Sequence, residues 1–93
     1  MRVSFKWRGK TVLGRIVEIG YGYSVVIGND GVRYHAPNYD FVPIDATKIE
    51  HAYDRLADAK AEWRKLTYDG LFVMPIEHDH RRNQYIFNEF VEN

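Results

Sequence analysis

Apolar side chains recur at every second position near the start of the chain. Val3, Phe5 and Trp7 alternate with polar or basic residues, which is the period of a half-buried strand. Runs rich in β-branched residues follow, and glycine-containing turns separate them. Between Pro37 and Pro43 we expect a turn of 3₁₀ helix and a short last strand. The predicted strands cover residues 3–7, 11–19, 23–27 and 32–36 and a short stretch before residue 44.

Turn residues indicate how these strands connect. Gly9 lies where the alternation pauses, so Arg8-Gly9-Lys10 is expected at the tip of a first hairpin. The run "GNDG" at 28–31 tolerates the positive φ of a second hairpin turn. Gly14 lies inside the second strand, where we expect a bend or bulge. Five short, bent strands predict a small closed barrel over residues 2–44.

The apolar period changes at Asp45. Over residues 46–67 apolar side chains recur about every 3.6 positions, which predicts one amphipathic helix. Asp45 or Thr47 is the expected N-cap, and Gly70 follows the expected end. We expect the apolar stripe to pack on the barrel. Alternatively, it pairs with a partner protein or a second copy, which would make a homodimer possible.

The remaining residues, 71–93, form a C-terminal extension of mixed signals. Leu71–Ile76 has the composition of a strand that ends near Pro75, whereas Tyr85–Val91 fits a short helix or an edge strand equally well. Together the patterns predict a mainly β member of the α+β class, folded as a single domain over residues 1–93.

Composition limits the classes of function. The chain has 93 residues, of which 45% are hydrophobic, enough for one modest core. It has no cysteine, which excludes disulfides and thiolate metal sites. No apolar run is long enough for a membrane span or a signal peptide, so a cytoplasmic protein without membrane partners is expected.

Charge is unevenly distributed although the formal net charge is zero. Residues 1–44 hold six basic and three acidic residues, whereas residues 71–93 hold two basic and four acidic ones. In one interpretation Trp7 belongs to the core and the basic residues only solvate the outer face. In the other, cations and exposed rings form a nucleic-acid surface. The candidate binding residues are Lys6, Arg8, Lys10, Arg15, Tyr21, Tyr23, Arg33, Tyr34 and Tyr39.

The first half of the chain resembles a Src-homology-3-like small β-barrel of the KOW, Tudor and chromo kind. The shared elements are a polar-tipped first hairpin, a bent strand ending in "GRIVEI", a hairpin carrying "NDG" and a closing "FVPI". The resemblance covers residues 2–44. It implies a module that binds nucleic acid or peptides, with sites on loops at residues 6–10, 20–23 and 34–39.

Other chemistries have weaker signals. Tyr21, Tyr23 and Tyr39 could hold a methylated ammonium if their rings converge. His78 and His80 are weak candidates for metal ligands, so no metal or other cofactor is predicted. The chain has no phosphate-binding glycine loop and no recognisable catalytic set.

We therefore predict a small non-enzymatic binding module whose ligand is nucleic acid. The alternative is a protein-interaction module or inhibitor that docks on a partner through aromatic and acidic surfaces.

Overall fold

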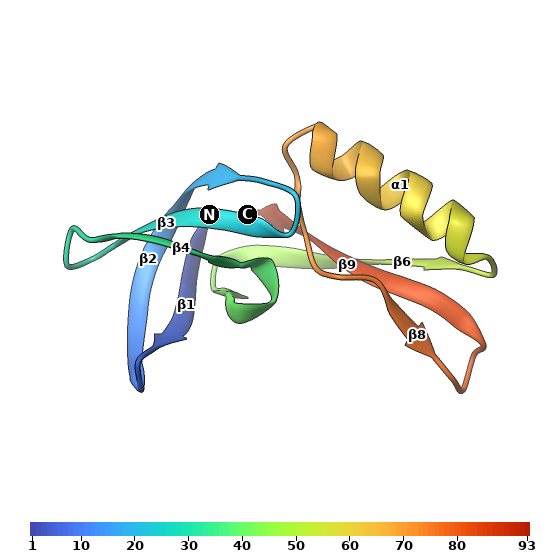
Figure 1. Cartoon of the computed structure of the whole chain (residues 1–93), viewed down its shortest axis with the longest axis horizontal. Helices are drawn as coiled ribbons and strands as arrows, with labels where there is room; N and C mark the ends of the chain where they lie inside the picture. The colour runs from blue at the N-terminus through green and yellow to red at the C-terminus, as the bar shows by residue number, and fades with distance from the viewer.

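Two β-sheets and one helix make up the chain in a computed structural model that describes residues 1–93 (Figure 1). Strands account for 55% of the residues, which confirms the mainly β class. The elements are β1 (Arg2–Trp7), β2 (Lys10–Ile19), β3 (Tyr23–Gly28), β4 (Arg33–Pro37), the 3₁₀ helix η1 (Asn38–Asp40), β5 (Val42–Pro43), β6 (Ala46–Tyr53), α1 (Leu56–Tyr68), β7 (Phe72–Val73), β8 (Glu77–Asp79) and β9 (Gln84–Glu92).

The first sheet has the order β4-β3-β2-β1-β5 and is antiparallel throughout. Its five strands and the 3₁₀ turn lie where the sequence predicted them. The predicted closed barrel is wrong, because β4 and β5 are the two edges of an open sheet and do not pair with each other. Closure would need hydrogen bonds between these edges, and the two-residue β5 pairs only with β1.

The predicted tip of the first hairpin is confirmed. Trp7 pairs with Lys10, which leaves Arg8 and Gly9 as a two-residue turn. Their φ angles of 49° and 80° are both positive, as a type I′ turn requires. The irregularity in β2 falls at Val17 instead of Gly14. Gly14 instead allows β3 to approach closely, because a Cβ there would lie only 2.6 Å from the carbonyl oxygen of Ile27.

One face of this sheet forms the main core. Val3, Phe5 and Val26 are buried there, and Phe41 and Phe72 close the cluster from the following segments. Trp7 continues the same alternation but lies beside the turn of the hairpin, where 38% of its surface is exposed. The expectation that Trp7 belongs to the core is therefore wrong, because the sheet ends there and leaves the ring only partly covered.

The second sheet pairs β9 with β6, β7 and β8. Residues 46–53, predicted to begin the helix, form strand β6 instead. All eight residues of β6 pair with β9, and His51 and Tyr53 stack against the buried ring of Phe87. Long-range pairing therefore overrides the helical spacing of the apolar residues. The predicted caps Asp45 and Thr47 are wrong for the same reason.

The helix α1 is shorter than predicted and packs mainly on the second sheet, not on the first. It packs on β6, β7 and β9, with Ala59 fully buried. The Trp63 indole N–H donates to the Met74 carbonyl at 2.9 Å, which ties the helix to the segment after β7. Gly70 follows the last turn with a φ of 81°, so the predicted stop signal is confirmed.

A polar contact joins the two sheets. Asn38 is 1% exposed, and its Oδ1 accepts a hydrogen bond from the Ser24 hydroxyl at 2.6 Å. Its Nδ2 donates to the carbonyl of Val73 in β7 at 3.3 Å. This side chain therefore links β3 of the first sheet to the second sheet.

Candidate functional site

A groove of about 490 Å³ opens at the end of the first sheet, between the tip of the β1–β2 hairpin and the β3–β4 turn. Four of its lining residues, Arg8, Lys10, Asn29 and Asp30, lie in segments that the sequence predicted as hairpin turns. The lining residues are Trp7, Arg8, Lys10, Thr11, Val12, Leu13, Asn29, Asp30 and Tyr34.

Trp7 and two cations form one wall of this groove. The Arg8 guanidinium carbon lies 6.0 Å from the centroid of the Trp7 ring, a cation–π distance. Lys10 pairs with Trp7 across the hairpin, so the two side chains share one face of the sheet. The wall therefore offers an exposed aromatic ring flanked by two positive charges.

Tyr34 and Asp30 line the groove next to Trp7. Tyr34 packs edge-on against Trp7, with ring centroids 5.3 Å apart. Its hydroxyl donates to Asp30 Oδ2 at 2.7 Å, and the backbone N–H of Val32 donates to Asp30 Oδ1 at 2.9 Å. These hydrogen bonds, led by that from Tyr34, lower the pKa of Asp30, while the same contact raises the pKa of Tyr34. Tyr34 is 8% exposed, so it supports Trp7 and is not the exposed ring that was predicted.

The remaining predicted cations do not join the groove. Lys6 points to the other face of the sheet, where its Nζ donates to Thr11 Oγ1 at 2.8 Å. Arg15 shares that face, opposite Arg2. Arg33 lies in β4 and pairs with Glu18 at 3.3 Å. Strand alternation thus divides the basic residues between two faces.

Tyr21, Tyr23 and Tyr39 are exposed, as predicted, but each contacts a different neighbour. Tyr21 lies near Trp63 of α1, with ring centroids 6.1 Å apart, and Tyr23 lies 5.6 Å from His35. Tyr39 lines a separate groove with Met74 and Glu77. The three rings therefore do not build the aromatic cage that was considered.

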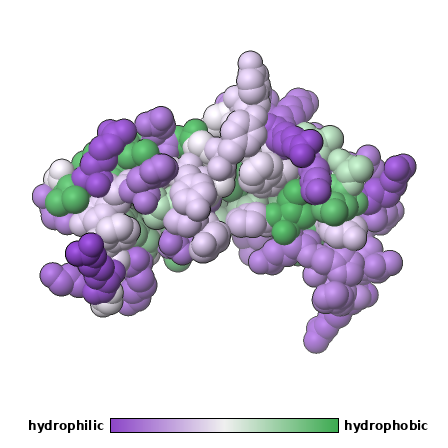
Figure 2. All heavy atoms as spheres, in the orientation of Figure 1, coloured by the Kyte–Doolittle hydropathy of each residue, from purple (hydrophilic) through white to green (hydrophobic).

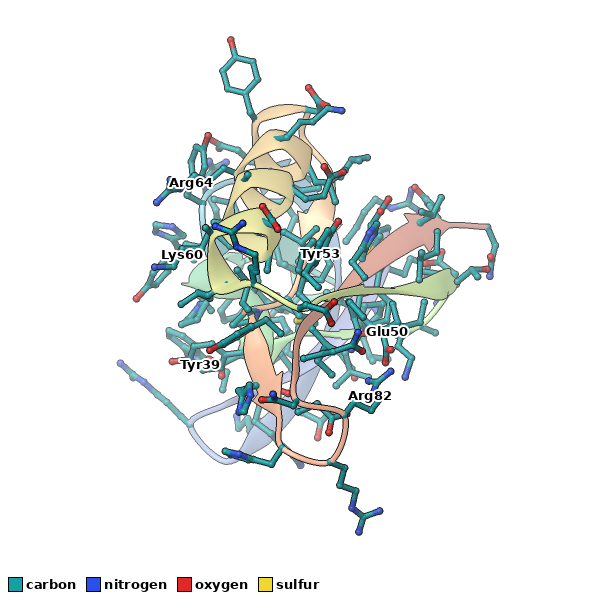
Figure 3. All side chains as sticks on the ribbon, turned by 90° about the vertical axis from the view of Figure 1, so that its right-hand side faces the viewer. Tyr39, Glu50, Tyr53, Lys60, Arg64 and Arg82 are labelled. Carbon is teal, nitrogen blue, oxygen red and sulfur yellow. The ribbon has the colours of Figure 1, made fainter.

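The part of the surface around these tyrosines includes cations that the sequence did not single out. Figure 3 shows Lys60 and Arg64 projecting from α1 on the same side as Tyr39. In Figure 2, pale residues of near-neutral hydropathy cross the middle of the face seen there, and hydrophilic residues lie toward both ends. These two cations lie on α1, away from the hairpin groove.

The histidines fall into separate environments. His78 and His80, the candidates for metal ligands, lie together, with their Nδ1 atoms 3.2 Å apart. His51 Nε2 lies 2.8 Å from Glu89 Oε1 and is held in the second sheet. His35 lies in β4 beside Tyr23. No group of three or more His, Cys, Asp or Glu side chains is arranged to hold a metal ion.

The helix α1 has neither the length nor the apolar content needed to span a bilayer. Comparison with known proteins identifies no relative, because no protein-family model, curated protein or solved structure matches this chain.

Proposed function

We propose that the chain binds single-stranded nucleic acid in the groove between the β1–β2 hairpin and the β3–β4 turn. The observation that carries this proposal is the exposed Trp7 ring with Arg8 and Lys10 beside it. Unpaired bases stack on aromatic rings whatever their identity, and cations neutralise the adjoining phosphates. The groove places both kinds of contact within the reach of one or two nucleotides.

The contacts that hold the Trp7 ring in place favour a role in base stacking. Tyr34 holds the edge of the ring, and its own hydroxyl is fixed by Asp30. A ring held in this way loses little conformational freedom when a base stacks on it. Asp30 adds one negative charge to the groove, so we expect moderate affinity and little sequence preference.

A titration with single-stranded oligonucleotides at low salt tests the proposal through the two indole N–H resonances of the chain. The resonance of Trp7 should shift. That of Trp63, whose N–H is bound to the Met74 carbonyl, should stay in place and serves as an internal control.

Affinity should depend on the Trp7 ring. Because stacking contributes about 1–3 kcal/mol per base, Trp7→Leu should weaken binding roughly 5- to 150-fold. Because Trp7 is 38% exposed, Trp7→Leu should keep the fold, and the 3–5 kcal/mol typical of a core tryptophan does not apply. If no oligonucleotide shifts the Trp7 resonance, the proposal fails and the protein-interaction alternative becomes the better explanation.

A further inference from the structure

We propose that His78 and His80 chelate a late first-row divalent metal ion, such as Zn²⁺, through their Nδ1 atoms. The two histidines lie at the end of the β8–β9 hairpin, which projects from the lower right of the molecule in Figure 1. Both side chains are exposed, so an ion can reach them from solvent.

The separation of the two nitrogens fits chelation. Zn–N bonds of about 2.0–2.1 Å that meet near the tetrahedral angle place their nitrogens roughly 3.3 Å apart. The Nδ1 atoms of His78 and His80 are 3.2 Å apart. The distance between the two nitrogens therefore suits a bridging ion, once the rings turn so that both Nδ1 lone pairs point at it.

The hydrogen bond to Asn83 selects the tautomer of His78. Nε2 of His78 lies 3.2 Å from Asn83 Oδ1, which can only accept, so Nε2 carries the proton. Nδ1 of neutral His78 therefore bears the lone pair that a metal needs. In the metal-free pair, Nδ1–H of His80 donates to this lone pair. Metal binding displaces that proton, and His80 takes one at Nε2, so both rings stay neutral.

The surrounding turn holds the pair in place. The ring of Tyr85, across the hairpin from His78, lies 4.9 Å from the His78 ring. Asp79 accepts hydrogen bonds from the backbone N–H groups of Arg81 and Arg82.

Arg82 also pairs with Asp79 and, at 2.7 Å, with Glu50 (Figure 3). Its charge is therefore balanced by two carboxylates and opposes an incoming cation only weakly. Because Arg82 occupies the Asp79 carboxylate, this carboxylate does not bind the ion. The protein therefore supplies two ligands to the ion, the two histidines, and water supplies the others.

The test is a titration of the ¹⁵N-labelled chain with ZnCl₂, followed through the backbone amide resonances. Saturable shifts at residues 77–85 are expected, and MgCl₂ should cause none because Mg²⁺ prefers oxygen ligands. His78→Gln and His80→Gln should each reduce the affinity to that of a single exposed imidazole. His35→Gln removes a lone exposed histidine of β4 and should leave the affinity unchanged, which makes it the matched control.

A variant of Asn83 gives a second, independent test of the zinc site. Its φ of 51° is positive, so Asn83→Gly removes the carboxamide while keeping a residue suited to that backbone. Loss of an orienting outer partner weakens metal binding about 10- to 100-fold, and Asn83→Gly should do the same here. The proposal is overturned if millimolar ZnCl₂ leaves residues 77–85 unshifted, or if either histidine variant binds as tightly as the unmodified chain.

Discussion

Arg8 occupies a backbone conformation that suits its neighbour Gly9 better than it suits an arginine. Its φ of 49° lies in the left-handed region, which costs most L-residues about 1–2 kcal/mol and asparagine less. Asn-Gly is also the pair that two-residue type I′ turns favour. The chain itself uses asparagine at a positive φ in the turn that ends at Asn83. Arg8→Asn should therefore relieve strain in the hairpin tip.

The size of the effect follows from two opposing terms. Relief of the turn should contribute about 1 kcal/mol. Loss of the guanidinium beside Trp7 should remove about 0.5 kcal/mol, the low end for exposed cation–π contacts. The net gain of about 0.5 kcal/mol corresponds to a rise in Tm of roughly 2–4 °C for a chain of this size. Oligonucleotide affinity should fall, because Arg8→Asn removes one of the two cations of the groove.

Thermal unfolding and oligonucleotide binding, measured on the same samples, test this trade-off. Arg8→Ala is the matched control, because it removes the same charge without supplying a residue suited to positive φ. It should lose affinity to the same extent as Arg8→Asn and should unfold at a lower temperature than the unmodified chain. The reasoning is refuted if Arg8→Asn is less stable than Arg8→Ala, or if Arg8→Asn binds oligonucleotides normally.

Two further predictions concern stability. Ser24→Ala leaves the buried Oδ1 of Asn38 without its donor, so it should cost about 1–3 kcal/mol in urea unfolding. Combined with Asn38→Ala it should cost about 1 kcal/mol less than the sum of the single variants, whereas additive costs would contradict the contact. Tyr34→Phe removes the main cause of the lowered pKa of Asp30. A depressed carboxyl pKa stabilises the fold at neutral pH and loses this effect in acid, so the stability difference between Tyr34→Phe and the unmodified chain should shrink below about pH 4. A stability difference between Tyr34→Phe and the unmodified chain that does not vary with pH would contradict this role of the Tyr34–Asp30 hydrogen bond.

Local patterns were enough to predict the first sheet but not the second. The first strand before residue 44 alternates, the later ones are rich in β-branched residues, and glycine-containing turns separate them, so each could be recognised on its own. Residues 46–53 carry apolar side chains at spacings that fit a helix, yet they pair with β9, almost forty residues further along the chain. Which structure forms there depends on a distant partner, and a single sequence does not show that partner.

Only part of the candidate site could be predicted, and the reason is similar. The tip of the first hairpin was recognised, and with it Arg8 and Lys10. The exposure of Trp7 was not, because alternation assigns a residue to a face but does not show where the sheet ends. The pairing of Tyr34 with Asp30 likewise depends on the detailed geometry of the β3–β4 turn.

The salt dependence of oligonucleotide binding tests the central claim most directly. Each phosphate contact on a single strand contributes about −0.7 to the slope of log affinity against log salt concentration. Arg8→Ala combined with Lys10→Ala should therefore flatten the slope by roughly 1.4. Lys60→Ala combined with Arg64→Ala removes the same charge from α1 and should leave the slope unchanged. Equal flattening by both pairs, or none from the Arg8 and Lys10 pair, would contradict a binding site in the hairpin groove.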